Sequence, residues 1–488
     1  MKGLLSLTVF LPLAAVLLLA FVPRSRENLV KGAVAIVAAV VLALTIWIYV
    51  HPSWASLTEA HSWISDADFE IQCKFKVDGI SAAMLLLTAL LTLVSIACSW
   101  NSIRTHVKEF YLLLLALETG MLGVFAAYDL FLFYVFWEVT LIPMYFIIGA
   151  WGGPRRMYAS IKFIVFTVAG SLFMLAAIII VAHEGRSFDL ETLTAPGNPI
   201  HKLGDIRDWL FLAFFFAFAI KVPLFPLHTW LPDAHVEAPT AGSVILAGIL
   251  LKMGTYGLIR FALPLFPGSA KTFAVPIMIL AVIGIIYGAL MALAQGDIKR
   301  LIAYSSVSHL GFIVLGIFAG NADAMQGAVM GMVNHGLSTG ALFLLVGAIY
   351  DRTHRRGVDD FGGLAATMPR YATVFLITTL SSVGLPGLNG FIGEVLVLIG
   401  TFSMQPWIAA VAALGVIFGA VYMLRLYRGM FFGRVSNPAN SEGPDLTPGE
   451  LVYLAPLVVL MIALGVVPGL LLSKTREAAD GIMRALGM

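Results

Sequence analysis

The sequence predicts an all-α polytopic membrane protein with about fourteen transmembrane helices, including two inverted five-helix repeats that each contain a broken helix. Three observations carry this prediction: the composition, the number of long apolar runs, and a matched pair of helix interruptions. Of the 488 residues, 60% are hydrophobic and only 12% are charged, about half the charged share of a typical soluble domain. Such a chain cannot cover its surface with polar groups, so we expect lipid to be its main solvent.

Fourteen apolar runs are long enough to cross about 30 Å of hydrocarbon. The first run lacks a clear A-x-A cleavage site and is followed by a charged turn, so we expect an uncleaved helix and not a signal peptide. The polar stretches near 51–78, 183–207, 351–370 and 433–449 are too short for a soluble domain, which indicates a single membrane domain. The runs lie near residues 4–22, 29–50, 79–100, 110–127, 129–150, 158–182, 208–228, 240–263, 272–294, 298–318, 322–350, 371–400, 404–431 and 450–473.

The distribution of Lys and Arg predicts the orientation of the helices, because cytoplasmic loops carry an excess of both. The loop from about 51 to 78 on one side is acidic. The opposite side is therefore expected to be cytoplasmic, which places both termini on the outer face. That basic side collects Arg24, Arg26, Lys31, Arg104, Lys108, Arg155, Arg156, Lys162, Lys299, Arg300, Arg352, Arg355, Arg356, Arg370, Arg425, Arg428 and Arg434.

Charge and cysteine content exclude several function classes. The net charge of +2 provides no basic field of the kind that binds nucleic acid. Cys73 and Cys98 make neither a metal-ligand cluster nor a disulfide framework, so we expect no iron–sulfur, haem or zinc site in this chain. The sequence contains no phosphate-binding loop, so we do not expect ATP to drive its activity.

Several ionisable residues fall in the middle of the apolar runs. Glu138 lies about ten residues into its helix, near mid-membrane at ~1.5 Å per residue. A charge at that depth costs roughly 2.5–3.5 kcal/mol even on the mildest scales, so it persists only when paired, hydrated or functional. The residues at similar depth are Lys221, Lys252, His309, His335 and Glu394, with Glu118 midway along the fourth run.

These residues have both a structural and a functional interpretation. A single buried Glu or Lys can form an ion pair that holds helices together, and His309 or His335 alone can be a satisfied interior histidine. Six ionisable groups on different helices favour a proton path, because protons hop between closely spaced acids, bases and waters, and histidine suits such a relay. His228 and His235 flank the end of the seventh run and are expected to be loop or entrance residues. Metal ligation is less favoured, because the histidines lack compact ligand spacing.

Two of the runs are interrupted at corresponding positions. The seventh contains Pro223 and Pro226, which remove backbone donors and clash with the preceding turn. The twelfth contains GLPGLNG at 384–390, with Glu394 close behind. Helices four to eight and nine to thirteen form two blocks of five, and the interrupted helix is the fourth of each block. This pattern is typical of transporter repeats with sites beside the breaks, although two unrelated kinks would also explain it.

Because five is odd, the two blocks enter the membrane from opposite faces and must be inverted. The expected divisions are an N-terminal three-helix segment at 1–109, a first repeat at 110–263, a second repeat at 264–432, and a C-terminal helix with its tail at 433–488.

Two stretches carry a specific family resemblance. Residues 221–240 read KVPLFPLHTWLPDAHVEAPT and continue to LLKMGTYG around Lys252, and residues 296–309 read GDIKRLIAYSSVSH. Both resemble the antiporter-like membrane subunits of respiratory complex I, the proton-translocating NADH:quinone oxidoreductase. The resemblance covers essentially the whole chain, including Trp137-Glu138 and Phe391-Ile-Gly-Glu394.

The resemblance implies fourteen helices, two inverted five-helix repeats, and a role for each deep ionisable residue. It places the proton path on an input-side pair of Glu138 and Lys221, a central relay at Lys252, axis residues His309 and His335, an output group at Glu394, and Glu118 in support.

The resemblance also implies a multi-pass subunit of a bacterial inner membrane that contacts lipids, protons and the other membrane subunits of complex I. This chain is expected to hold no redox cofactor. FMN, iron–sulfur clusters and quinone are expected in partner subunits, where NADH oxidation would supply the energy. The main alternative is a subunit of a multisubunit sodium/proton antiporter, which shares the fold and the central lysines. A membrane-bound hydrogenase relative and a purely structural scaffold are further alternatives.

Overall fold

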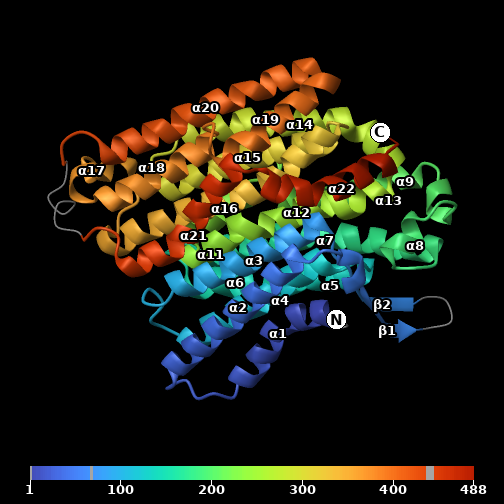
Figure 1. The fold of residues 1–488 in the computed structure, drawn as a ribbon, viewed down its shortest axis with the longest axis horizontal. Helices are drawn as coiled ribbons and strands as arrows, with labels where there is room; N and C mark the ends of the chain where they lie inside the picture. Colours follow the sequence, from blue (N-terminus) through green and yellow to red (C-terminus); the bar gives the residue numbers. More distant parts are fainter. Residues whose placement is uncertain (1–2, 66–69, 436–443, 488) are drawn as a thin grey trace.

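The chain forms a bundle of helices that run side by side along one direction (Figure 1). The computed structural model describes residues 3–65, 70–435 and 444–487. Residues 66–69 and 436–443 belong to two of the predicted polar stretches and lie outside the described residues. In Figure 1, α20 (Pro406–Phe431) lies along one long edge of the bundle and α1 (Leu4–Leu19) along the other. Between them lie α16 (Ala322–Thr353) and α12 (Leu251–Gly257).

Within the described part of the chain, eleven helical segments are long and apolar enough to cross a membrane, judged by length and composition. Two shorter apolar helices, α1 and α19, are added to these. The predicted helical membrane fold is therefore confirmed, and the count of fourteen crossings and the inverted repeats stay predictions.

A small β-hairpin interrupts the helical architecture within the stretch expected to be a polar loop. β1 (Glu59–Ser65) pairs antiparallel with β2 (Glu70–Phe75). The Glu59 carboxylate accepts hydrogen bonds from the backbone N–H groups of Leu5 and Ser6, which ties the hairpin to the start of the first helix. The elements around it are α1 (Leu4–Leu19), α2 (Glu27–Val50) and α3 (Gly79–Cys98).

The helix α8 lies at the same end of the bundle as the hairpin, and ion pairs join the two elements. Lys74 Nζ lies 2.7 Å from Asp189 Oδ1 and 2.5 Å from Glu191 Oε2, and Lys76 Nζ lies 2.5 Å from the other oxygen of Glu191. The helices of this part are α4 (Val107–Ala126), α5 (Leu130–Val139), α6 (Leu141–Trp151), α7 (Arg156–Gly185) and α8 (Leu190–Thr194).

The predicted seventh helix is broken, as its two prolines indicate. α9 (Ile206–Lys221) ends at Lys221, and α10 (Trp230–Glu237) begins after a turn that contains both prolines. The eighth run is a continuous but irregular helix whose most apolar stretch is entirely buried. It consists of α11 (Thr240–Ile245), the π-helical η3 (Leu246–Leu250), α12 (Leu251–Gly257), the π-helical η4 (Leu258–Ala262) and α13 (Leu263–Leu265).

The second half of the chain contains the longest helix and the second interruption. α18 (Pro369–Val383) stops at Gly384, whose φ of +80° is left-handed, and α19 (Asn389–Met404) resumes the helix. The other elements are α14 (Pro267–Leu293), α15 (Ile298–Phe318), α16 (Ala322–Thr353), α17 (Leu364–Thr367), α20 (Pro406–Phe431), α21 (Pro448–Val466) and α22 (Gly469–Ala485). The run predicted at 450–473 is thus divided between α21 and the start of α22.

Local sequence explains where the central helices begin. The side chains of Asp78, Asp129, Asp297 and Asn321 accept hydrogen bonds from first-turn N–H groups of α3, α5, α15 and α16, as residues preferred at helix N-caps do. The most apolar stretch of α16 is fully buried, whereas only 28%, 33% and 28% of the corresponding stretches of α2, α20 and α21 are buried. The core therefore lies around α16 and the helix built on α12, and the outer helices face the surroundings.

Candidate functional site

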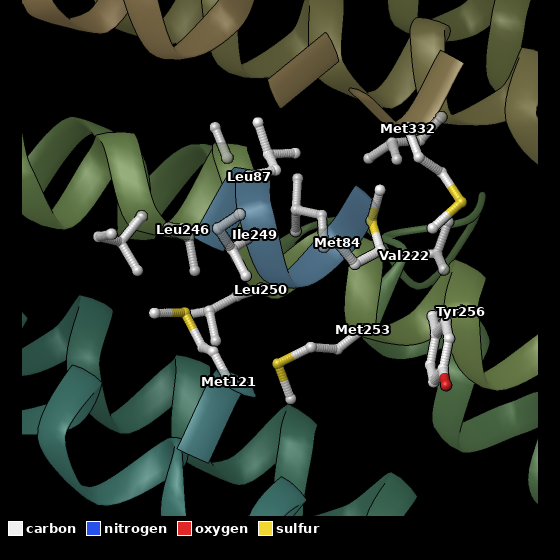
Figure 2. Close-up of a cluster of buried hydrophobic side chains, with 14 of the residues drawn as sticks. Met84, Leu87, Met121, Val222, Leu246, Ile249, Leu250, Met253, Tyr256 and Met332 are labelled. Atoms are coloured by element: carbon white, nitrogen blue, oxygen red, sulfur yellow. The ribbon is translucent and has the colours of Figure 1, made fainter. Parts of the chain in front are cut away.

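Lys252 occupies the centre of the bundle inside an apolar shell. It lies in α12, between two π-helical segments, and it is fully buried. Figure 2 shows Leu250 and Met253 of its own helix together with Met84 of α3 and Met121 of α4. The π-helical segments η3 and η4 on either side of Lys252 loosen the regular helical hydrogen bonding, and such segments occur frequently at functional sites. The Lys252 Nζ donates a 2.5 Å hydrogen bond to a backbone carbonyl in η3, that of Ala247.

A second partner of Lys252 comes from the longest helix. The Lys252 Nζ lies 2.5 Å from Nδ1 of His335 in α16. Glycines make this approach possible, because a Cβ on Gly336 would lie 3.1 Å from the carbonyl oxygen of Gly248 and 2.7 Å from Leu87. Close packing of η3 against α16 thus places the lysine and the histidine in direct contact.

From His335 the titratable groups continue towards the second helix break. The rings of His335 and His309 have centroids 5.9 Å apart. His309 Nδ1 lies 3.3 Å from Oε1 of Glu394, and Glu394 lies near the start of α19. The remaining ring nitrogen of His309 lies 3.3 Å from Ser382 Oγ and 3.4 Å from Tyr422 Oη. Four predicted site residues therefore form one connected series that runs from Lys252 to Glu394.

A cavity of about 30 Å³ lies within this series. His309, His335 and Glu394 line it, together with Asn334 and Ser382. It is large enough for a water molecule, which needs roughly 10–15 Å³ of such volume and two to four polar partners. The series can therefore be hydrated between His335 and His309, the two neighbours whose side chains are not in direct contact.

The predicted ion pair of Glu138 and Lys221 is absent from this structure, so that expectation is wrong for the conformation described. Lys221 Nζ and Glu138 Oε1 are buried and have no hydrogen-bond partner in the described residues. The ammonium group instead lies 5.3 Å from the ring centre of Trp137 and 5.4 Å from that of Phe163. These aromatic faces stabilise a cation, and Glu138 reaches Lys221 only by its longer-range field.

Glu118 also stands apart from its expected partner. It is fully buried in α4, and neither carboxylate oxygen has a hydrogen-bond partner among the described residues. It therefore makes no hydrogen bond to Glu138. An unpaired buried carboxyl is costly, which distinguishes Glu118 from an ordinary packing residue.

Two histidines expected to be loop or entrance residues are interior residues. His235 lies within α10, is fully buried, and stacks on Phe343 with ring centroids 4.5 Å apart. Neither of its ring nitrogens has a hydrogen-bond partner in the described chain. His228 is buried in the turn before α10, against Tyr287. Their proximity to the predicted break was the available signal, but the sequence did not show that the chain folds back into the core there.

Asn334, Ser382 and Tyr422 were not predicted as site residues. Asn334 directly precedes His335, and this adjacency was the only sequence signal for it. Ser382 and Tyr422 come from α18 and α20, and nothing in their local sequence distinguishes them from other polar residues of apolar helices. Among the residues that the structure describes, this site included, no group of three or more His, Cys, Asp or Glu side chains is arranged to hold a metal ion.

Comparisons with known proteins agree with this architecture. A family model described as the transmembrane part of NADH:quinone oxidoreductase and Mrp antiporters matches residues 127–419. NADH-quinone oxidoreductase subunit M of Rhodobacter capsulatus is 44% identical over 487 residues, covering 96% of this chain and 94% of the relative.

Solved structures match over nearly the full length as well. A chain of respiratory complex I from Thermus thermophilus with bound NADH superposes with a TM-score of 0.90 at 33% identity, covering 99% of this chain and 100% of that chain. A chain of the Mrp complex from Dietzia sp. DQ12-45-1b has a TM-score of 0.86 at 23% identity, with 99% of both chains covered. The second similarity concerns the fold alone.

The fold and the buried titratable series define an antiporter-like membrane subunit, a multi-pass membrane protein. The sequence identity and the near-complete coverage are more specific than the fold. The chain belongs to the family of NADH-quinone oxidoreductase subunit M. The resemblance to complex I seen in the sequence is thereby confirmed.

Proposed function

We propose that this chain translocates protons across a bacterial inner membrane as a subunit of respiratory NADH:quinone oxidoreductase. The observation that carries the proposal is the connected series Lys252–His335–His309–Glu394, with contacts of 2.5 Å at one end and 3.3 Å at the other. Buried titratable groups spaced this closely can pass protons by short hops. A purely structural ion pair that holds helices together would not require two histidines between a lysine and a glutamate.

In this proposal Lys221 and Glu138 form the input side, although they are apart in this conformation. An ionised Glu138 brought into contact with Lys221 would hold a proton there, and their separation would release it towards Lys252. Lys252 then relays the proton to His335 and onward to Glu394 as the output group. Each proton moved against 100 mV requires about 2.3 kcal/mol.

The energy is proposed to come from partner subunits. FMN, iron–sulfur clusters and quinone would be bound there, and this chain would respond through its contacts with neighbouring membrane subunits and lipids. Co-purification tests this arrangement. Flavin and iron–sulfur absorbance accompanying the chain supports it, whereas their absence, together with sodium-dependent pH changes, would identify a sodium/proton antiporter subunit instead.

The remaining architectural proposals concern orientation and repeats. Both termini are proposed to lie on the outer face, with fourteen crossings and two inverted repeats at 110–263 and 264–432. Both ends of the chain lie towards the hairpin end of the bundle (Figure 1), and α1 begins against Glu59 of the hairpin. This supports the placement of the termini, because the acidic stretch that contains the hairpin is expected on the outer face. Labelling single cysteines near each end with an impermeant reagent in intact cells tests the orientation.

The experiment that tests the function compares wild type with Glu138→Gln in inverted membrane vesicles. NADH-driven acidification is measured, and assembly of the complex is checked on a native gel. If the complex assembles and acidification collapses, Glu138 is a working part of a redox-driven proton pump. Unchanged acidification would contradict the roles assigned here to Glu138 and its neighbours.

A further inference from the structure

Asn334 connects the broken helix α18–α19 to the titratable series. Its Nδ2 donates a 2.6 Å hydrogen bond to the backbone carbonyl of Asn389, the first residue of α19. The Asn389 side-chain oxygen in turn accepts a 2.6 Å hydrogen bond from Ser381 Oγ in α18. Asn334 is therefore linked to both sides of the interruption, and it directly precedes His335.

The hydrogen bond to Asn389 settles how the Asn334 amide is oriented. A backbone carbonyl can only accept a hydrogen bond, so the amide nitrogen must face it, and the side-chain oxygen must point elsewhere. That oxygen is buried and has no partner among the described residues. Asn334 is 5% exposed, and an acceptor left unsatisfied at such a buried position destabilises the fold.

A second unsatisfied atom belongs to the neighbouring residue. His335 uses Nδ1 for Lys252, and its Nε2 is buried without a partner in the described chain. His335 is 4% exposed. Both residues line the cavity of about 30 Å³ that is shared with His309 and Glu394. One cavity of the right size is thus lined by two residues that each carry an unsatisfied buried polar atom.

We propose that Asn334 is a positioning residue that holds one water molecule between His335 and the His309–Glu394 pair. The water satisfies Asn334 Oδ1 and His335 Nε2 together. A proton leaves His335 at Nε2 and is taken up by this water, while the water gives one of its own protons to the His309–Glu394 pair. One proton therefore moves, and the water is regenerated. Because Asn334 is anchored to the start of α19, a shift of the broken helix would move the water and change this connection.

Tight packing at Gly393 supports the anchoring role. A Cβ added there would lie 3.1 Å from Asn334 Nδ2 and 3.1 Å from the backbone nitrogen of Gly331. α19 therefore packs directly on α16 at this level, with little space for the Asn334 amide to move independently. The inference rests on the proposed function, since a positioned water matters only if the series carries protons.

The test has a structural part that does not depend on any variant. Electron cryo-microscopy of the intact complex, at a resolution that resolves ordered water, is expected to show one water within hydrogen-bond distance of Asn334 Oδ1 and His335 Nε2. An empty cavity in a map that shows other buried waters would overturn the proposal.

The functional part uses Asn334→Leu, which has a similar volume and lacks the polar atoms. In assembled complex, NADH-driven pumping is expected to fall roughly tenfold, the effect of losing one hydrogen-bonded connection. Asn334→Ser leaves room for an additional water and is expected to retain most of the pumping, which a purely structural role would not predict. Thr379→Val is the matched control, because Thr379 Oγ1 is also buried and unsatisfied but does not line the cavity.

The outcomes separate the two proposals. Normal pumping by Asn334→Leu, in a complex where Glu138→Gln abolishes pumping, would overturn the role of Asn334 alone. Normal pumping by both variants would overturn the proposed function as well. If Asn334→Leu fails to assemble, the other two measurements decide. Loss of pumping by an assembled Asn334→Ser complex, or an empty cavity in the map, would overturn the proposal.

Discussion

Lys252 Nζ and His335 Nδ1 lie 2.5 Å apart although 83 residues separate them in the chain. Their contact joins the irregular helix of α11–α13 to α16, the two helices whose most apolar stretches are entirely buried. Among the described residues, the polar partners of Lys252 are one carbonyl and one imidazole, so this lysine is poised to exchange a proton with that imidazole.

Lys252→Met is expected to remove proton transfer while preserving assembly. Methionine has a similar length and no charge, so it fits the apolar shell without the cost of a buried ammonium. NADH-driven pumping should fall by about 10²-fold, the lower end of what loss of a proton-transfer group costs. Acidification in inverted vesicles measures this, and Lys271→Met is the control because Lys271 is exposed at the start of α14. Wild-type pumping by an assembled Lys252→Met complex would remove Lys252 from the path.

Gly384→Ala is expected to disturb Glu394, and a neighbouring glycine provides a matched control. Gly384 and Gly387 have left-handed φ values of +80° and +93°, so alanine costs roughly 1 kcal/mol of strain at either position. At Gly384 the new Cβ would also lie 2.8 Å from Glu394 Oε2, whereas at Gly387 nothing lies within 4 Å. Pumping assays should show a several-fold loss for Gly384→Ala alone. Equal losses for both variants would mean that strain, and not the position of Glu394, is responsible.

Arg260→Met is expected to destabilise the hairpin side of the bundle. Arg260 is paired with Asp78 and hydrogen-bonds to the hydroxyls of Tyr128 at 3.0 Å and Tyr256 at 3.2 Å. Removing one partner of a fully buried ion pair costs about 3–5 kcal/mol, because the other charge is left uncompensated; the Asp78 side chain is 26% exposed, so we expect a smaller loss here. The melting temperature of the purified complex should drop clearly. The double variant Arg260→Met/Asp78→Asn should recover part of the loss, since Asn still caps α3; no recovery would show that the lost tyrosine contacts dominate.

Glu191 is expected to make the attachment of the hairpin sensitive to acid. Burial alone would raise the pKa of Glu191, but hydrogen bonds from Lys74 and Lys76 outweigh it and hold that pKa below its ordinary value. The stabilisation is therefore complete above about pH 4.5, near the unfolded value, and is lost as the pH falls through the lower folded pKa. Hydrogen exchange of the hairpin amides between pH 7 and pH 3.5 measures this loss.

Glu191→Gln should loosen the hairpin by about 0.5–1 kcal/mol at neutral pH and abolish this acid-dependent part. The difference between wild type and the variant isolates Glu191 from Asp129, because burial raises the pKa of Asp129 to about 6 and its contribution changes with pH in the opposite direction. Glu184→Gln, a change on the exposed end of α7, serves as the control. Identical pH profiles for wild type and Glu191→Gln would refute the assignment.

The sequence by itself determined the class of fold and the approximate position of the membrane-spanning segments. Apolar runs set which segments prefer lipid, and prolines at 223 and 226 and glycines at 384 and 387 set where helices stop. Both are local properties of the chain. The deep positions of Lys252, His335 and Glu394 followed from the same runs, because depth in a membrane is proportional to the distance along a helix.

Only the tertiary structure decided which of these groups meet. Lys252 contacts His335 because Gly336 lets α16 approach η3, whereas the Lys221 ammonium group lies against aromatic rings and does not contact Glu138. The buried place of His235 and the unsatisfied oxygen of Asn334 likewise depend on helices distant in the sequence. Contacts between side chains are set by how helix faces pack against one another, and a pattern of residues along one chain records the solvent preference of each face but not the neighbour that covers it.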